Sequence, residues 1–279
     1  RQSSARTFLD PARKRANVTV VTKALAERIL FDGGRACGVA AIIDGQPTTF
    51  HCDGEVIVCA GTMESPLLLQ RSGIGDAARL RAVGIEPLVD SPDVGERMIE
   101  HLSFSMPYRL TQDVGSHRDF FGFGAVKAMV RYLLTRTGIM ATGPFEVGAF
   151  CNVAHPDGRT DLQLYLGGYT FAIGDDNNPV PLDKIDPRPG ITIYGQLLRL
   201  TSEGSLRVTG PSVTDAPDIM PNWLTTEHDR ASAIACIRLM RRYMQQEPLR
   251  GLVGQEMLPA ALARDVGFHA YCGGSRNAT

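Results

Sequence analysis

Residues 55–61 (EVIVCAG) constrain the fold more than any other stretch of the sequence. The run is almost continuously apolar, which is typical of a strand buried on both faces of a parallel sheet. Ser65 can then cap a helix, Pro66 suits its first turn, and residues 72–73 (SG) end it. These signals predict a strand–loop–helix unit of an α/β fold. The loop, residues 60–64, either binds a ligand through backbone N–H groups or is a plain connection.

An antiparallel β-meander is expected before this unit. Residues that favour strands fill the runs at residues 17–22 and 28–31, and the turn DGG follows at residues 32–34. Residues 37–43 can pair back across that turn, and the dipeptide at residues 44–45 (DG) begins a second hairpin turn. A meander beside a parallel strand favours an α/β domain that binds a nucleotide.

Composition and charge narrow the class of protein. Of 279 residues, 43% are hydrophobic, and the net charge of -1 argues against a nucleic-acid partner. No run approaches the roughly 18 apolar residues that a membrane span needs. The six cysteines form no CxxC pair, which predicts reduced thiols in a cytoplasmic protein. Peripheral attachment to a membrane is left open.

Several catalytic motifs are missing from the sequence. The six histidines show neither i,i+4 pairing nor clustering with cysteine, so no metal site is expected. A GxSxG nucleophile elbow is absent, which argues against a serine hydrolase. No strand–GxGxxG–helix unit occurs, because the similar glycine spacing at residues 73–78 follows a helical segment instead of a strand. A nucleotide-binding role therefore needs other support.

Residues 61–75 (GTMESPLLLQRSGIG) resemble the second signature of the glucose–methanol–choline (GMC) oxidoreductases. The shared pattern is glycine, a small residue, two variable residues, Ser-Pro, and apolar residues leading to Ser-Gly-apolar-Gly. Residues 93–101 are similar to a further family stretch, from which Asp93 and Glu100 depart. The likeness is closest to choline dehydrogenase-like members. Other stretches that resemble the family are residues 2–9, 143–150, 201–208 and 221–224.

The resemblance implies an FAD-dependent enzyme that oxidises a small-molecule primary alcohol, with oxygen or a quinone chain as electron acceptor. It implies an α/β plus α+β fold: a partial FAD-binding, Rossmann-like domain (residues 1–101), a substrate domain on a mixed or antiparallel sheet (102–255) and a return segment (256–279). The family's N-terminal strand and GxGxxG loop have no counterpart in the sequence. We therefore expect a truncated form that binds FAD weakly on its own. A non-catalytic remnant and one part of a split flavoprotein are the alternatives.

The resemblance also assigns catalytic residues. Residues 268–273 are similar to the family's histidine motif, which makes His269 the catalytic base, and Asn277 is the second polar group, for the developing alkoxide. A histidine with an ordinary pKa can take the hydroxyl proton at neutral pH. Since the motif has one extra residue here, a histidine in a frayed tail is the alternative.

Cofactor and substrate contacts follow from the same resemblance. FAD contacts are implied for Ala26, Ala60, Gly61 and His101. In the substrate domain, Glu146 either walls the active-site cavity or binds a cationic group such as trimethylammonium. A surface or structurally paired glutamate is the alternative.

Within the substrate domain, strand composition marks residues 165–169 and 191–198. Thr226 is expected to cap a helix, with His228 and Asp229 in its first turn as cap and surface residues. The apolar face of this helix is expected to use, at helical spacing, Ala231, Ile234, Ile237, Met240 and Met244.

Overall fold

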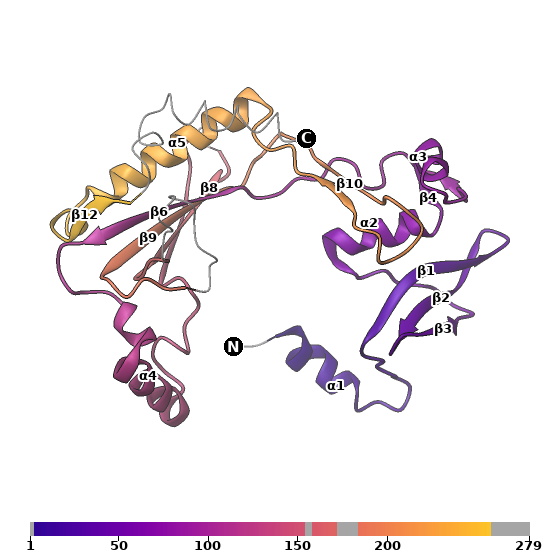
Figure 1. The fold of residues 1–279 in the computed structure, drawn as a ribbon, viewed down its shortest axis with the longest axis horizontal. Helices are drawn as coiled ribbons and strands as arrows, with labels where there is room; N and C mark the ends of the chain where they lie inside the picture. Colours follow the sequence, from indigo (N-terminus) through magenta and orange to yellow (C-terminus); the bar gives the residue numbers. More distant parts are fainter. Residues whose placement is uncertain (1–2, 154–157, 172–183, 258–279) are drawn as a thin grey trace. The chain divides into compact units, whose positions relative to one another are not determined.

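The computed structural model describes residues 3–153, 158–171 and 184–257, and these form two compact units (Figure 1). Unit 1 consists of Arg1–Ile99 with Glu203–Asn222, and unit 2 of Glu100–Ser202 with Trp223–Thr279. Each unit builds its own sheets and its own buried contacts.

Unit 1 combines a β-meander with short helices. The meander β1–β2–β3 is antiparallel throughout, as expected, and its two turns contain Gly34 and Gly45 at positive φ (87° and 80°). Residues 17–22 form no strand, so that prediction is wrong: β2 ends opposite Ala24, where β1 begins, and offers no further partner. The elements of unit 1 are η1 (Ala5–Leu9), α1 (Asp10–Ala12), β1 (Ala24–Asp32), β2 (Arg35–Ile43), β3 (Gln46–His51), α2 (Gly61–Arg71), β4 (Ile74–Gly75), α3 (Ala77–Ala82), β5 (Val89–Asp90), β10 (Ser205–Arg207) and β11 (Asp218–Met220).

The predicted parallel strand after the meander is not formed. Residues 52–60 are irregular, and the side chain of Ile57 is 79% exposed. A strand that is buried on both faces needs neighbouring strands for its backbone N–H and C=O groups. Within the described part of unit 1, β3 pairs with β2 and nothing pairs with residues 55–60. The apolar pattern therefore lacks the partner that would make it a strand.

The helix after this segment begins earlier than predicted. α2 starts at Gly61 with Ala60 as its N-cap residue, so Ser65 lies inside the helix. Pro66 is then also inside it, where its nitrogen cannot donate to the carbonyl of Thr62. Thr62 is exposed, and water can replace that hydrogen bond. The proline is tolerated for this reason, and the helix extends up to the loop.

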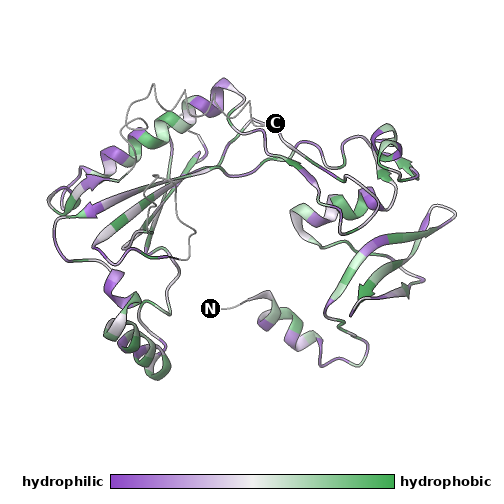
Figure 2. Cartoon of the chain, in the orientation of Figure 1, coloured by the Kyte–Doolittle hydropathy of each residue, from purple (hydrophilic) through white to green (hydrophobic). Residues whose placement is uncertain are grey.

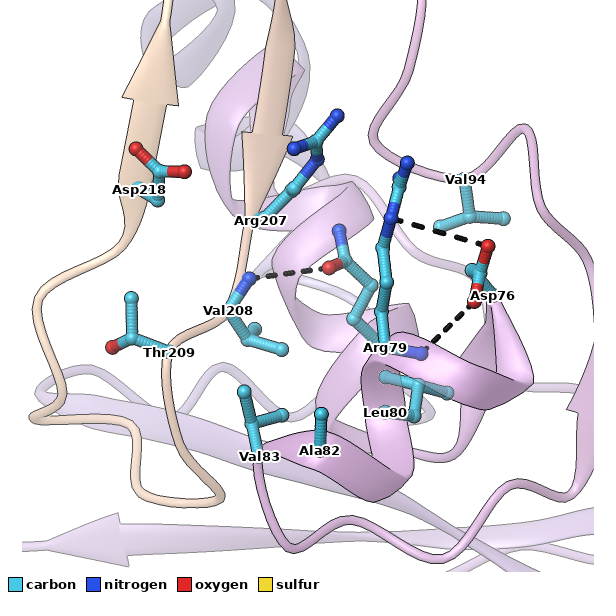
Figure 3. Close-up of a pocket in the computed structure, with 11 residues that line it drawn as sticks. Asp76, Arg79, Leu80, Ala82, Val83, Val94, Arg207, Val208, Thr209 and Asp218 are labelled. Atoms are coloured by element: carbon cyan, nitrogen blue, oxygen red, sulfur yellow. Dashed lines mark hydrogen bonds and ion pairs between the residues drawn. The ribbon is translucent and has the colours of Figure 1, made fainter.

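Gln70 joins α2 to β10, although Gln70 and Leu206 are 136 residues apart in the sequence. The buried amide of Gln70 donates to the carbonyl of Leu206 (2.9 Å) and accepts from the N–H of Val208 (3.1 Å), and Figure 3 shows the second bond. Gly95 is packed so closely here that a Cβ atom would meet the Leu206 carbonyl and the Gln70 amide. These contacts fix residues 203–222 within unit 1.

Glu96 connects the same region through two arginines. Arg207 donates from Nε to Oε1 (2.9 Å) and from Nη2 to Oε2 (3.2 Å), and Arg79 also donates to Oε1. The hydrogen bond from Arg207 lowers the pKa of Glu96, burial opposes the shift, and Arg79 adds to the lowering. Glu96 is therefore ionised in the folded protein down to lower pH than in the unfolded chain.

Unit 2 is a five-stranded antiparallel sheet with a long helix, α5, on one face (Figure 1). The strand order is β12-β6-β9-β8-β7, which confirms the expected antiparallel sheet. β9 matches the strand predicted at residues 191–198, whereas β8 begins earlier than the strand predicted at residues 165–169 and ends at Gly167. The elements of unit 2 are β6 (Ser103–Leu110), η2 (His117–Phe120), α4 (Gly122–Thr135), β7 (Val147–Cys151), β8 (Leu162–Gly167), β9 (Gly190–Leu197), α5 (Glu227–Met244), η3 (Leu249–Gly251) and β12 (Val253–Glu256).

α5 packs on the sheet through small and sulfur-containing side chains. Ala233, Cys236 and Met240 are fully buried in the core that they share with Ile193 of β9. Gly195 of β9 makes room for them, because a Cβ atom there would meet Cys236 Sγ and Met240 Sδ. The close approach of helix and sheet thus depends on one glycine.

The predicted apolar face of α5 is partly wrong. Met240 and Met244 are buried as expected, but Ala231 is exposed and Ile234 and Ile237 are only half-buried. Ile234 and Ile237 still pack against the core from its edge, and the fully buried line continues toward the N-terminus through Cys236, Ala233 and Asp229.

Asp229 is a second correction in α5, because it is fully buried instead of lying on the surface. Its carboxylate accepts from the N–H groups of Thr201 (2.8 Å) and Ser202 (2.8 Å). Burial raises the pKa of Asp229, but the hydrogen bonds from Ser202 and Thr201 outweigh burial and hold the pKa below its usual value. Thr226 is the N-cap, as predicted, and its side chain accepts from the N–H of Asp229. Asp229 therefore ties the start of α5 to the chain that leaves β9.

Glu96→Gln is expected to destabilise the protein in a pH-dependent way. Because the folded pKa of Glu96 lies below its ordinary value of 4.5, the carboxylate contributes stability above that pH and loses it as the pH falls through the folded pKa. The free energy of unfolding should fall by about 1 kcal/mol at neutral pH and by less in acid, as measured by urea unfolding. Asp93→Asn, which removes an exposed ion pair with Arg97, should change little at either pH. An equal loss for Glu96→Gln at both pH values would contradict the role of its charge.

Gly195→Ala is expected to lower the free energy of unfolding by about 1–3 kcal/mol, the usual cost of overpacking a core. The added methyl group would press on Cys236 and Met240 and push α5 from the sheet. Gly148→Ala on β7 is the matched control, because its Cβ atom would make only ordinary contacts. Thermal unfolding followed by circular dichroism distinguishes the two, and equal stability of both variants would show that the helix has room to move.

Candidate functional site

The sheet of unit 2 has one face that α5 does not cover. Ile193 and Leu197 of β9 point into the core with α5, so the alternating residues Tyr194 and Gln196 lie on the opposite face. Tyr165 of β8 pairs with Tyr194 in the antiparallel register and shares that face. All three side chains are half-buried. This open face therefore presents aromatic and amide groups to whatever lies above the sheet.

Phe145, just before β7, completes an aromatic cluster on this face. Its ring stacks on Tyr165, with centroids 4.9 Å apart, and meets Tyr194 edge-on at 5.0 Å. Burial raises the pKa of Tyr194, with a smaller contribution from the nearby Tyr169, so the Tyr194 hydroxyl stays neutral at physiological pH. The cluster offers the faces and edges of neutral π-systems, which attract cations through the ring quadrupole.

A chain of hydrogen bonds crosses the same face. Gln196 Nε2 lies 2.9 Å from His101 Nδ1, and the Tyr165 hydroxyl donates to Gln196 Oε1 at 3.1 Å. Since the amide nitrogen donates, Nδ1 of His101 accepts, and the neutral ring carries its proton on Nε2. Gln196 thus sets the tautomer of His101 and leaves the Nε2–H group, on an exposed side chain, as a donor.

Glu146 adds a negative charge near Tyr169, which is itself a neighbour of Tyr194 in the aromatic cluster. Its backbone N–H donates to the carbonyl of Leu166 (3.1 Å), and its exposed carboxylate lies close enough to Tyr169 to help burial raise the pKa of that tyrosine. Among residues 3–153, 158–171 and 184–257, no hydrogen bond or ion pair engages the Glu146 carboxylate. Structural pairing, one alternative for this residue, is therefore not found within the described chain. An unpaired carboxylate next to aromatic rings can attract a cation.

In unit 1, Ala60 and Gly61 form the N-terminus of α2. Among the described residues no side chain caps this end, and the acidic residue of the first turn, Glu64, is held by Arg71 at 3.2 Å. Gly61 has φ of 86°, and a Cβ atom there would meet nothing within 4 Å. The space beside Gly61 is therefore open in the described part of the chain. Uncapped N–H groups at the positive end of a helix dipole fit the phosphate or carbonyl oxygens of a dinucleotide such as FAD.

Ala26 belongs to the strand against which α2 packs. It pairs with Ala41 of β2 and is followed by a bulge at Glu27, whose carbonyl accepts from Arg71 Nε at 3.1 Å. Arg71 is buried and so fastens β1 to α2. Unit 1 thus brings Ala26, Ala60 and Gly61 onto adjoining elements.

The sequence-predicted site residues fall into three groups. Ala26, Ala60 and Gly61 lie in unit 1, and His101 and Glu146 lie in unit 2. His269 and Asn277 lie outside the described residues.

Three residues of the open face were missed by the sequence analysis, namely Tyr165, Tyr194 and Gln196. Period-two alternation in residues 191–198 carries the signal that could have found two of them, because Tyr194 and Gln196 alternate there with Ile193, Gly195 and Leu197.

The described residues gather no group of three His, Cys, Asp or Glu side chains that could hold a metal ion. Across the same part of the chain, every helix is too short or too polar to cross a membrane.

Comparison with known proteins identifies the fold and the family. Two models of the GMC oxidoreductase family match residues 1–103 and residues 201–274. The oxygen-dependent choline dehydrogenase of Burkholderia vietnamiensis (strain G4 / LMG 22486) is 32% identical over 265 residues, which are 95% of this chain and 45% of that protein. The chain therefore spans about half the length of the curated relatives that it matches.

Solved structures show the same fold at lower sequence identity. A formate oxidase is 21% identical with a TM-score of 0.80, over 93% of this chain and 49% of that chain. Pyridoxine 4-oxidase from Mesorbium loti is 22% identical with a TM-score of 0.76, over 96% of this chain and 47% of that chain. The expected fold class, α/β joined to α+β, is confirmed by this likeness and by the sheets of the two units.

The two family matches lie at opposite ends of the chain and together cover more than half of it. They include the signature at residues 61–75 and the stretches at residues 2–9, 93–101 and 201–208 from which the resemblance was inferred. The resemblance is thereby confirmed, and the chain belongs to the GMC oxidoreductase family, whose cofactor is FAD.

Proposed function

We propose that this chain is part of an FAD-dependent oxidoreductase that acts on the CH–OH group of a primary alcohol carrying a cationic group, as choline does. The observation that supports this most directly is the carboxylate of Glu146, which has no partner among the described residues and lies near Tyr169, a neighbour of Tyr194 in the cluster of Phe145, Tyr165 and Tyr194. The family is established, and a relative that is 32% identical is named a choline dehydrogenase.

The chemistry of choline fits the open face of unit 2. A trimethylammonium group is a weakly hydrated cation without hydrogen-bond donors, so it is held by π-faces and by a nearby carboxylate and not by polar contacts. Phe145, Tyr165 and Tyr194 supply the rings, and Glu146 supplies the charge. The Nε2–H group of His101, oriented by Gln196, is then available to an acceptor atom of the cofactor. The face therefore suits a cationic ligand held beside the cofactor.

Bound FAD would supply the hydride acceptor for oxidation of the carbinol carbon. The residues proposed to hold it are Ala26, Ala60 and Gly61, with the uncapped end of α2 toward its anionic part. His101 is proposed as a further cofactor contact. In this assignment, residues 1–101 contribute to the FAD-binding domain, residues 102–255 form the substrate domain and residues 256–279 return to the FAD-binding domain.

His269 is proposed to take the proton from the substrate hydroxyl, and Asn277 to donate a hydrogen bond to the alkoxide that develops. The protein's own contribution is thus to move one proton, to stabilise one negative oxygen and to orient the cationic end. The electron acceptor, oxygen or a quinone chain, and a cytoplasmic location belong to the same proposal.

Glu146→Gln in the whole gene product is expected to raise KM for choline on the order of tenfold, because the cation loses its partner charge. The neutral isostere of choline, in which carbon replaces nitrogen, should show no such change. Glu227→Gln, at an exposed glutamate of α5 in the same unit, is the matched control. Steady-state kinetics with both substrates measures the effect. Equal changes for choline and its isostere would show that Glu146 does not bind a cation.

His269→Ala in the same protein is expected to lower kcat on the order of 100-fold or more, the scale of removing a general base. The bound flavin, followed by its visible absorbance, should be unchanged. His51→Ala, at an exposed histidine of β3, controls for loss of an imidazole elsewhere. A His269→Ala variant that keeps near-full turnover would place the catalytic base at another residue.

A further inference from the structure

The helix α4 (Gly122–Thr135) exposes its large apolar residues, whereas an ordinary surface helix buries them. It contacts its own unit through small residues: Ala128 is its one buried residue, and Gly124 lies so close to η2 that a Cβ atom would meet the carbonyl of Arg118. Its large apolar side chains point outward instead, with Phe123 83% exposed and Leu134 79% exposed. An amphipathic helix normally buries such a face.

The exposed apolar residues of α4 form one continuous stripe. Phe123, Val126, Val130, Leu133 and Leu134 follow each other at the spacing of a single helix face, and Met129 borders them. Figure 2 shows the green of hydrophobic residues along much of α4. Single exposed apolar side chains are common on proteins, but a stripe of this length marks a surface that another phase or molecule covers.

A hollow beside this stripe extends the apolar surface. It has a volume of about 410 Å³ and lies between α4 and the segment that follows it, lined mainly by Phe120, Val126, Met129, Ile139 and Met140. Asp119 and Ala125 complete its lining. A hollow of this kind can receive part of an acyl chain.

The charges on α4 and on the segment that follows it have one sign, and Asp119 of η2 is the acidic residue beside the hollow. Between Phe120 and Phe145 the sequence contains Lys127, Arg131 and Arg136 and no acidic residue. Lys127 and Arg131 are four residues apart and so flank the stripe on the same side of the helix. Arg131 donates to Thr137 Oγ1 (3.2 Å), and Arg136 lies over the ring of Tyr132, so neither contact neutralises the charge. The stripe is therefore apolar along its centre and cationic at its edge.

We propose that α4 lies flat on an anionic lipid surface, with its apolar stripe in the acyl boundary and Lys127, Arg131 and Arg136 at the level of the phosphates. A basic amphipathic helix with large apolar residues is the pattern that binds such an interface. A second copy of the chain is a poorer occupant, because the acid-free stretch would bring its cations against identical cations. Anionic headgroups supply the complementary charge.

The test is co-sedimentation of the full 279-residue chain with vesicles. Vesicles of equal parts phosphatidylcholine and phosphatidylglycerol should bind the chain, and vesicles of phosphatidylcholine alone should bind it much less. Added salt should weaken the binding. Lys127→Gln and Arg131→Gln should each lower the partition coefficient about fivefold. Leu133→Ser with Leu134→Ser should lower it on the order of tenfold or more.

Matched controls separate this surface from general stickiness. Ile57→Ser removes an equally exposed apolar side chain from unit 1, and Arg242→Gln removes a cation from the exposed side of α5, so both should bind like the unchanged chain. Far-ultraviolet circular dichroism confirms that each variant is folded. The proposal is overturned if the anionic vesicles do not bind the chain, or if the Leu133 and Leu134 substitutions leave binding intact. It is also overturned if these substitutions abolish self-association, measured by analytical ultracentrifugation, without changing lipid binding.

Discussion

The contact between α5 and β9 is the constraint on which unit 2 depends. Gly195 lets Cys236 and Met240 lie directly on the strand, and burial raises the pKa of the Cys236 thiol to about 12, with a smaller effect of Cys151, so it behaves as a small apolar group. Because side chains alternate along a strand, fixing Ile193 and Leu197 toward α5 fixes Tyr194 and Gln196 on the other side. The composition of the open face is therefore a consequence of how the helix packs.

Buried polar side chains help to hold the remote segments in place, beside the backbone pairing of Gly204 with Met98. Gln70 satisfies the backbone on both sides of Arg207 in β10, and Asp229 satisfies two consecutive N–H groups after β9. Each removes the cost of leaving buried backbone groups unpaired, which is commonly about 1–3 kcal/mol per group. In both cases one side chain forms the hydrogen bonds to a distant backbone segment that a neighbouring strand forms in a sheet.

Turns, single strands and a helix start could be predicted from the sequence, because residues within each of these elements determine its structure. The turns at Gly34 and Gly45, the strand β9 with part of β8, and the start of α5 after Thr226 all follow from turn residues, strand composition or a capping residue. The strand predicted at residues 55–60 was wrong, because burial on both faces depends on neighbouring strands that the apolar run itself cannot specify. The face of α5 was predicted only in part for a similar reason: Ile234 and Ile237 pack at the edge of the core, whereas Gly195 on the distant strand lets Cys236 and Met240 lie at its centre. For the site, resemblance supplied His101 and Glu146, whereas the cluster around Phe145 is a tertiary contact without a local signal.

The short helix η2 supports both surfaces of unit 2 to which a function is assigned. On one side, the carbonyl of Arg118 limits how closely α4 can pack, which is why α4 uses glycine and alanine there and turns its large residues outward. On the other side, the ring of Phe120 meets Tyr169 edge-on, with centroids 5.0 Å apart. Burial and the charge of Glu146 together raise the pKa of Tyr169. The Tyr169 hydroxyl therefore stays neutral, and Glu146 carries the negative charge. η2 therefore contacts both Tyr169, near the cation site proposed at Glu146, and α4, the helix proposed to bind lipid.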